Sequence, residues 1–319
     1  MKRGPATRPA TSGWSDWQIL SPGLTLGDAV LAETLDGGQA FRWHRDDGIW
    51  TGIFADHIIR LTLLDGAAAP SPRSDQSATR ASRLHGQLHW SVPVALAESA
   101  GPALAHYFDG SRDTVALADS LPWRSDAHLA ACLAAFPGLR ILRQPFGETL
   151  LGFLCSATKQ IVQIKQMLAL LAERHGATVV PGCHRLPTWG ELALIPEPEL
   201  RACQLGFRAR FISQTARFLA SHPGWLEETE ALPYAAAKGR LCSLPGVGEK
   251  IADCVLLFGA GRLEAFPVDT WILKAMAARY GLHGWKPAQV AQFGRAHFGP
   301  LAGLAQQYLF AYERQFGGR

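Results

Sequence analysis

A lysine after a glycine turn and an aspartate further along the chain are the residues whose types and spacing most suggest chemistry. Lys250 stands directly after the turn in the stretch RLCSLPGVGEKIADC (240–254), at the start of a predicted helix. The helix macrodipole disfavours a cation at this end, and a neutral amine is a nucleophile that forms Schiff bases. The alternative is that Lys250 extends into solvent or binds a phosphate.

Asp269 lies in AFPVDTWILKAM, where Pro267 predicts an extended entry into another helix. Its simplest role is to cap that helix, which is worth about 1 kcal/mol. A carboxylate that faced the same cleft as Lys250 could also stabilise positive charge on a sugar ring or assist proton transfer. The two roles are compatible.

The turn between the two helices is predicted to form a hairpin over residues 242–250. Glycines at 246 and 248 allow positive φ and a close approach of another backbone. The N–H groups of the turn and of the new helix could bind an anionic oxygen, so the geometry suits contact with DNA phosphates. The alternative is a corner between helices in which the glycines only make room.

The composition is that of a soluble globular protein, with 319 residues, 48% hydrophobic and 18% charged. A formal net charge of +4 permits an anionic partner. The six cysteines include no C-x2-C pair, which predicts reduced thiols in a cytoplasm and no iron–sulfur cluster. No run reaches the roughly 18 apolar residues of a membrane span.

Hydrophobic periodicity divides the chain into an arm and two domains. Residues 1–15 are basic and rich in Pro, Ala and Thr, which predicts a disordered arm. Residues 16–120 are predicted to form a β-rich domain, with a flexible Ser/Pro/Ala-rich loop at about 66–84. Residues 121–319 show helical periods throughout, so the fold class is α+β.

The hairpin with its lysine, followed by FPVDTWI, resembles the helix–hairpin–helix DNA glycosylases. The closer resemblance is to the 8-oxoguanine DNA glycosylase branch, bifunctional enzymes with glycosylase and AP lyase activity. It extends over roughly residues 15 to 315 and includes the segments GGQAFRW, YFDG, LRILRQPFGETLLGFLCSATKQI, LGFRARFISQTA and GPLAGLAQQYLF. It implies an N-terminal antiparallel β-sheet domain (TBP-like) and an all-α glycosylase domain.

The resemblance implies a role for each matching residue in the base-excision chemistry. Lys250 would attack the deoxyribose C1′ and form the Schiff base, and Asp269 would be the catalytic carboxylate. The target nucleoside must leave the base stack to reach them, at a cost of a few kcal/mol.

The same resemblance implies a pocket for the flipped base. The carbonyl of Gly38 would accept the N7–H that 8-oxoguanine has and guanine lacks. Cys254 and Phe310 would sandwich the base, and Gln306 would bind its Watson–Crick edge. Without the resemblance, Gly37-Gly38 would equally suit a hairpin turn, and the other three residues would suit a core or a helix surface.

The DNA-binding residues implied by the resemblance include several departures from the family pattern. Thr158 and Lys159 stand in a run where the family has asparagines, and Gln163 replaces an arginine. The other implied contacts are Gly246, Val247 and Gly248 of the hairpin, a retained Arg208, Phe207 in place of a tyrosine, and Trp271 in place of a histidine. These departures predict weaker discrimination for cytosine opposite the lesion.

A monovalent cation, Na⁺ or K⁺, is the one bound ion that the resemblance implies. Its ligands would be the main-chain carbonyls of Cys242, Leu244 and Val247, and no other cofactor is required. The implied partner is double-stranded DNA that contains a damaged base, bound by a monomer. The expected compartment is a bacterial cytoplasm, at the nucleoid, or a eukaryotic nucleus.

Two other functions are compatible with the same motifs. A monofunctional alkylbase (3-methyladenine-type) glycosylase would need the aspartate and not the lysine, and a non-catalytic hairpin module would use both glycines only for phosphate contact. The sequence also leaves open whether ring-opened purines are substrates and how strong the lyase step is.

Overall fold

The computed structural model describes residues 13–64 and 85–317. The flexible loop predicted at about 66–84 therefore lies outside the described residues, as does the predicted arm up to residue 12. Beyond that point Trp14 forms an isolated antiparallel bridge with Pro93, and the Ser15 N–H donates to the Val92 carbonyl at 2.6 Å, so the last residues of the predicted arm are held in place. None of the described helices is long and apolar enough to cross a membrane.

Six strands form one antiparallel sheet in the order β1-β6-β5-β4-β3, with β2 also paired to β6. The strands are β1 (Gln18–Ile19), β2 (Thr25–Leu26), β3 (Trp43–Asp46), β4 (Ile49–Phe54), β5 (His57–Leu64) and β6 (Gly86–Ser91). Buried and more exposed residues alternate along β4, which is the pattern of a strand with one face on the core. The predicted turn between β3 and β4 is present, with positive φ at Asp47 and Gly48.

A helix interrupts the region that the sequence predicted as strands and turns. Helix α1 (Asp28–Asp36) buries Leu31 and Leu35 in the core, and its end is marked by the Gly37 N–H, which donates to the Glu33 carbonyl at 2.9 Å. Gly37 and Gly38 thus connect a helix to β3, and the hairpin-turn interpretation of this pair is wrong. A nine-residue helix offers too few turns to be distinguished from a strand by periodicity alone.

Helices make up nearly all of the rest of the chain. They are α2 (Ala97–Tyr107), α3 (Thr114–Asp119), α4 (Ala127–Ala135), α5 (Phe146–Leu154), α6 (Ile161–His175), α7 (Trp189–Leu194), α8 (Glu197–Leu200), α9 (Arg208–Ser221), α10 (Trp225–Ala231), α11 (Tyr234–Cys242), α12 (Glu249–Phe258), α13 (Thr270–Tyr280), α14 (Pro287–Phe298) and α15 (Ala302–Phe316). A two-stranded ribbon, β7 (Thr178–Val180) with β8 (Cys183–His184), corrects the all-α prediction for this part. The α+β fold class is confirmed.

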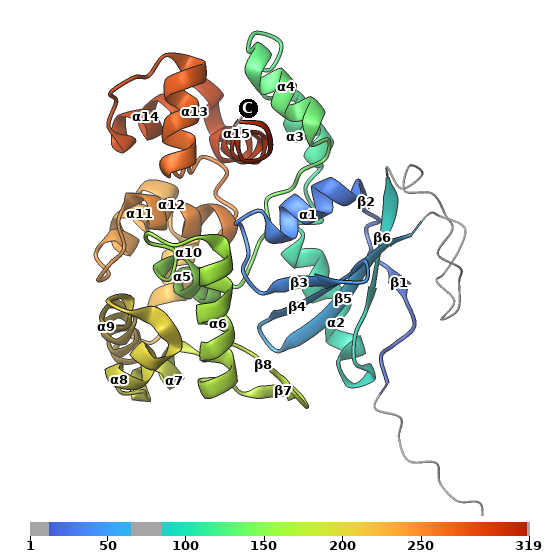
Figure 1. Ribbon diagram of the computed structural model, residues 1–319, viewed down its shortest axis with the longest axis vertical. Helices are drawn as coiled ribbons and strands as arrows, with labels where there is room; N and C mark the ends of the chain where they lie inside the picture. Colours follow the sequence, from blue (N-terminus) through green and yellow to red (C-terminus); the bar gives the residue numbers. More distant parts are fainter. Residues whose placement is uncertain (1–12, 65–84, 318–319) are drawn as a thin grey trace, which may run out of the picture.

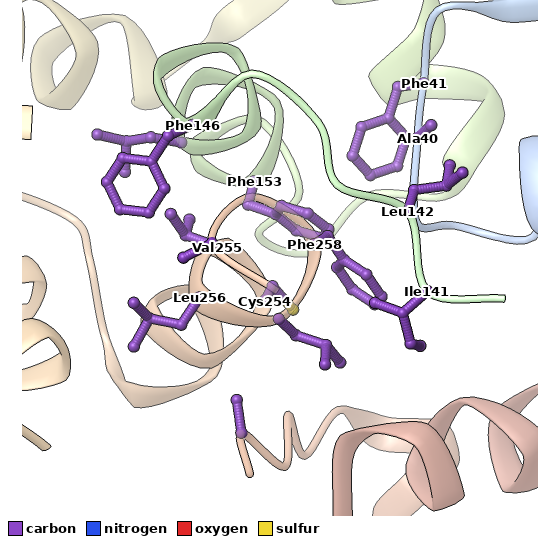
Figure 2. Close-up of a cluster of buried hydrophobic side chains, with 14 of the residues drawn as sticks. Ala40, Phe41, Ile141, Leu142, Phe146, Phe153, Cys254, Val255, Leu256 and Phe258 are labelled. Carbon is purple, nitrogen blue, oxygen red and sulfur yellow. The ribbon is translucent and has the colours of Figure 1, made fainter. Parts of the chain in front are cut away.

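Helix α2 packs against the sheet, where Trp43 Nε1 donates to Tyr107 Oη at 2.9 Å. The helices from α5 onward stand beside the sheet, with α6 nearest its β3–β4 side and α15 close to α1 (Figure 1). Arg42, just before β3, donates hydrogen bonds to the carbonyls of Leu168 on α6 and His184 on β8, at 3.1 and 2.6 Å. Helices α5 and α12 pack against each other in the middle of the helical part. Figure 2 shows Phe153 of α5 and Phe258 of α12 lying together, with the Cys254 sulfur on the same side.

Candidate active site

One cavity lies where α5, α12 and α15 meet the segment after α1. It brings together six residues that the sequence analysis placed at the catalytic centre or in the base pocket. They are Gly38, Lys250, Cys254, Asp269, Gln306 and Phe310. A wider cleft continues outward from it and shares Gly38, Lys250, Asp269 and Phe310 with the cavity.

The two glycines of the hairpin that precedes Lys250 differ in backbone conformation and in the space around them. Gly246 has φ +79°, and a Cβ there would lie 2.6 Å from the Phe211 ring of α9, so both backbone and packing require glycine. Gly248 caps α12 with φ −94° and has open space around its Cβ position. Only Gly246 therefore has the positive φ that the sequence suggested for both, while Gly248 leaves room for an outside group.

The Lys250 amine faces the outer cleft and is half-buried. Its Nζ donates to Ser156 Oγ at 3.2 Å and lies 5.3 Å from the centre of the Phe153 ring. The two acidic residues nearest to it on α12, Glu249 and Asp253, instead pair with Lys238, at 3.3 and 3.0 Å. These carboxylates are thus engaged elsewhere, and the structure shows no salt bridge of Lys250 with any described residue.

Asp269 caps a helix and also lines the cavity, so its position is compatible with both predicted roles. Its Oδ1 accepts the Ile272 N–H at 2.8 Å and so caps α13. Burial raises the pKa of this carboxyl, while the bonded N–H of Ile272 and the nearby charge of Lys250 act in the opposite direction. Its side chain also lines the same cavity as Lys250, where a carboxylate could act on a bound sugar.

Cys254 lies one helical turn after Lys250, on the cavity wall. Burial raises the pKa of its thiol to about 12, although Lys250 acts in the opposite direction. The side chain is therefore a neutral, apolar surface at physiological pH, which suits contact with a flat ring and not nucleophilic attack.

Gly38 is a position at which the pocket requires glycine. Its φ is +104°, and a Cβ there would lie 3.3 Å from Ile161 Cδ1 and 3.6 Å from Phe310 Cε1. The backbone of residue 38 thus forms a wall of the cavity where any side chain would intrude.

We expect Gly38→Ala to cost about 1 kcal/mol of stability through its positive φ and, in addition, to lower the activity of the site at least about tenfold. Gly48→Ala is a matched control, since Gly48 has φ +79° and nothing within 4 Å of its Cβ position. Thermal unfolding should show at least as much destabilisation at position 38, where the new Cβ also meets Ile161, as at position 48. Single-turnover excision should show lost activity only at position 38. Equal activity in both would contradict this role for Gly38.

Gln306 is 4% exposed, and its Oε1 is buried without a hydrogen-bond partner among the described residues. Buried polar atoms are rarely left without a partner, so an acceptor in this state on a cavity wall suits a ligand that donates. Phe310 lies one turn further along α15 on the same wall.

The outer cleft contains four of the predicted DNA-binding residues, Thr158, Lys159, Gly248 and Trp271. Thr158 has φ +56°, a conformation that is strained for a β-branched residue. Trp271 is 45% exposed, and Phe207, at the start of α9, is 51% exposed. Large apolar side chains exposed beside a cleft are typical of a binding surface.

Arg208 is buried, contrary to the expectation of a side chain that faces DNA. It donates to the carbonyl of Ala157 and, at 3.0 Å, to Thr158 Oγ1, so in this structure it holds the strained turn. Gln163 is likewise engaged, since its Oε1 accepts the Gln160 N–H at 3.2 Å at the start of α6.

Three residues of the site were missed by sequence reasoning. Phe153 and Ser156 contact the Lys250 amine, and Gln307 lines the cavity beside Gln306. Ser156 lies two residues before the run at 158–160 that differs from the family pattern, and this could have drawn attention to it. Phe153 could not be distinguished from an ordinary residue of an apolar helix.

The carbonyls proposed for a cation lie in the hairpin. The Leu244 carbonyl accepts the Val247 N–H at 3.1 Å, and no described backbone N–H outside the regular helices bonds to the carbonyls of Cys242 or Val247. These oxygens therefore keep lone pairs for a hard cation such as Na⁺ or K⁺.

Comparisons with known proteins show which family the chain resembles over most of its length. Residues 23–150 match the family model of the 8-oxoguanine DNA glycosylase N-terminal domain. A probable N-glycosylase/DNA lyase of Methanothermobacter thermautotrophicus is 30% identical over 92% of this chain and 96% of its own length. The chain belongs to the 8-oxoguanine DNA glycosylase/lyase family.

Two further members of the 8-oxoguanine DNA glycosylase/lyase family are similar to this chain over most of its length. An N-glycosylase/DNA lyase of Arabidopsis thaliana is 28% identical over 91% of this chain and 79% of its own length. The 8-oxoguanine glycosylase/lyase of Clostridium acetobutylicum, solved with double-stranded DNA that contains cytosine opposite 8-oxoguanine, is 27% identical. It superposes with a TM-score of 0.78 over 95% of this chain and 99% of its own.

Proposed function

We propose that this protein removes 8-oxoguanine from double-stranded DNA and then cleaves the strand at the abasic site, acting as a monomer. The observation that supports this most directly is that Lys250 and Asp269 share one cavity with Gly38 and the unpartnered Gln306. A nucleophile, a carboxylate and a pocket with polar walls are what a bifunctional glycosylase needs. Membership of the family supports the same reaction.

In the proposed reaction, the Lys250 amine bonds to C1′ of the flipped nucleoside and the glycosidic bond breaks. The electron pair of that bond leaves with the base, which gains a proton, and the sugar ring opens to a Schiff base with Lys250. Loss of a proton from C2′ then expels the 3′ phosphate in a β-elimination, and water hydrolyses the Schiff base to release Lys250. The Asp269 carboxylate stabilises positive charge on the sugar.

Four residues are proposed to select the base. The Gly38 carbonyl accepts the N7–H that distinguishes 8-oxoguanine from guanine, Cys254 and Phe310 lie on its two faces, and Gln306 binds its Watson–Crick edge. The neutral thiol of Cys254 and the free acceptor of Gln306 both suit these roles.

The DNA strand is proposed to lie along the outer cleft. The N–H groups at the start of α12 would bind a phosphate, where Gly248 leaves open space. Lys159 supplies a positive charge, and the exposed rings of Phe207 and Trp271 supply surfaces for stacking. A monovalent cation held by the carbonyls of the hairpin would add positive charge beside the same phosphate.

Borohydride trapping with duplexes that contain different damaged bases tests this function. We expect a covalent protein–DNA adduct with 8-oxoguanine and little with undamaged guanine or 3-methyladenine. Excision of 3-methyladenine without any adduct would favour the monofunctional glycosylase. Binding without excision of any base would favour the non-catalytic module.

We expect the unaltered protein to excise 8-oxoguanine opposite each of the four bases at rates within about tenfold of one another. The reason is that Gln163 is bound to the start of α6 and Arg208 to the turn at 157–158, which leaves few side chains to bind the orphaned base. Single-turnover rates with four duplexes measure this. A strict requirement for cytosine would contradict it.

The variant Thr158→Asn provides a gain-of-function comparison for this opposite-base preference. Asparagine tolerates positive φ and restores the residue type of the family's run, so we expect a higher unfolding temperature and a stronger preference for cytosine.

A further inference from the structure

Gln307 is a polar residue on the wall of the cavity to which the resemblance gives no role. It is 2% exposed, and its Nε2 is buried without a hydrogen-bond partner among the described residues. Successive residues of a helix point about 100° apart, so on α15 Gln306 and Gln307 lie on either side of the line through Phe310. Both amides therefore face the cavity that Phe310 lines.

Another buried glutamine of the chain has both ends of its amide bonded. Gln39 Nε2 donates to the Arg140 carbonyl at 2.9 Å, and its Oε1 accepts the Leu142 N–H at 3.0 Å. Gln39 is fully buried and links two segments, as a structural glutamine does. Gln307 Nε2 has no such partner within residues 13–64 and 85–317, which destabilises the free protein and suits a donor that serves a ligand.

The wall of the pocket thus contains a buried acceptor, Gln306 Oε1, and a buried donor, Gln307 Nε2, neither of which has a partner among the described residues. The outer edge of a guanine-derived base has N–H donors and one carbonyl acceptor, O6, whereas an adenine-derived base has an amino donor in place of O6. Two donors that face each other without a partner are strongly disfavoured in a buried site. The pair of glutamines therefore suits a base that keeps the C6 carbonyl.

We propose that Gln307 donates a hydrogen bond to O6 of the flipped base and restricts the enzyme to oxidised purines that keep this carbonyl. This class contains 8-oxoguanine and ring-opened guanine and excludes adenine-derived lesions. The inference rests on the proposed glycosylase function and adds a specificity-determining residue to it.

The test compares the unaltered protein with Gln307→Leu, which has nearly the same volume, on three substrates. These are 8-oxoguanine, 8-oxohypoxanthine, which keeps the C6 carbonyl, and 8-oxo-2-aminopurine, which lacks it. Loss of one hydrogen bond should slow single-turnover excision roughly tenfold on the first two substrates and leave the third within about twofold. An equal loss on all three would overturn the proposal.

Thermal unfolding separates a ligand-binding glutamine from a structural one. Gln307→Leu removes an unpartnered donor, so its unfolding temperature should equal or exceed that of the unaltered protein. Gln39→Leu breaks two hydrogen bonds, so its unfolding temperature should fall. A fall at position 307 as large as that at position 39 would overturn the proposal.

A second variant and the activity of the unaltered protein distinguish failure of this proposal from failure of the glycosylase function. Gln307→Met gives a second apolar side chain without a donor and must show the same substrate pattern as Gln307→Leu, or the proposal fails. Failure of the unaltered protein to excise 8-oxoguanine would instead overturn the glycosylase function itself.

Discussion

Lys250→Gln is expected to abolish the borohydride-trapped adduct and to slow base excision by at least about 10³-fold. Glutamine is one bond shorter than lysine and keeps a polar N–H donor near Ser156, but its amide cannot form a Schiff base. Trapping with 8-oxoguanine duplexes and single-turnover excision measure the two losses separately.

Lys159→Gln is the control for this prediction, because Lys159 lies in the same outer cleft as Lys250. We expect this variant to bind DNA more weakly, with a smaller salt dependence, while the trapped adduct still forms. An adduct that survives Lys250→Gln would refute the assignment of the nucleophile. If Lys250→Gln changes only the affinity for DNA and its salt dependence, and the unaltered protein excises no base, the non-catalytic interpretation is favoured.

Asp269→Asn is expected to slow excision by about 10²–10⁴-fold without a measurable change in unfolding temperature. Asparagine caps helices as well as aspartate does, so it can still accept the Ile272 N–H and preserve the start of α13. What it lacks is the negative charge beside the bound sugar. Excision kinetics and thermal unfolding of the same variant therefore separate the two roles of Asp269.

Two further variants test this separation. Asp113→Asn changes the cap of the exposed helix α3 and should alter neither activity nor stability. Asp269→Ala should lose about 1 kcal/mol of stability as well as activity. Normal excision by Asp269→Asn would show that Asp269 acts only as a cap.

The pH profile provides an independent check on Asp269. Burial raises the pKa of its carboxyl, so the reactive carboxylate becomes protonated at a higher pH than an ordinary aspartate. The excision rate should thus fall on acidification before an exposed aspartate would titrate. This acidic limb should be missing from the residual activity of Asp269→Asn.

The hairpin and the spacing of its lysine and aspartate were predictable because local rules determine them. A turn with positive φ at Gly246, a helix start before Lys250 and a cap at Asp269 each depend on a few adjacent residues. The resemblance extended this local pattern to the pocket, and the structure brings those pocket residues to one cavity. Helix α1 was missed because its short apolar pattern is ambiguous at this length.

By itself the sequence determined the α+β class, the order of the hairpin, lysine and aspartate, and hence the family. Only the tertiary structure decided that Ser156 binds the Lys250 amine and that Arg208 is turned inward to Thr158. It also decided that Gln307 Nε2 is buried without a partner in the part of the chain that the structure describes. The physical reason is distance along the chain. Ser156 and Lys250 are 94 residues apart, and a hydrogen bond between such residues depends on how whole helices pack, which no local pattern encodes.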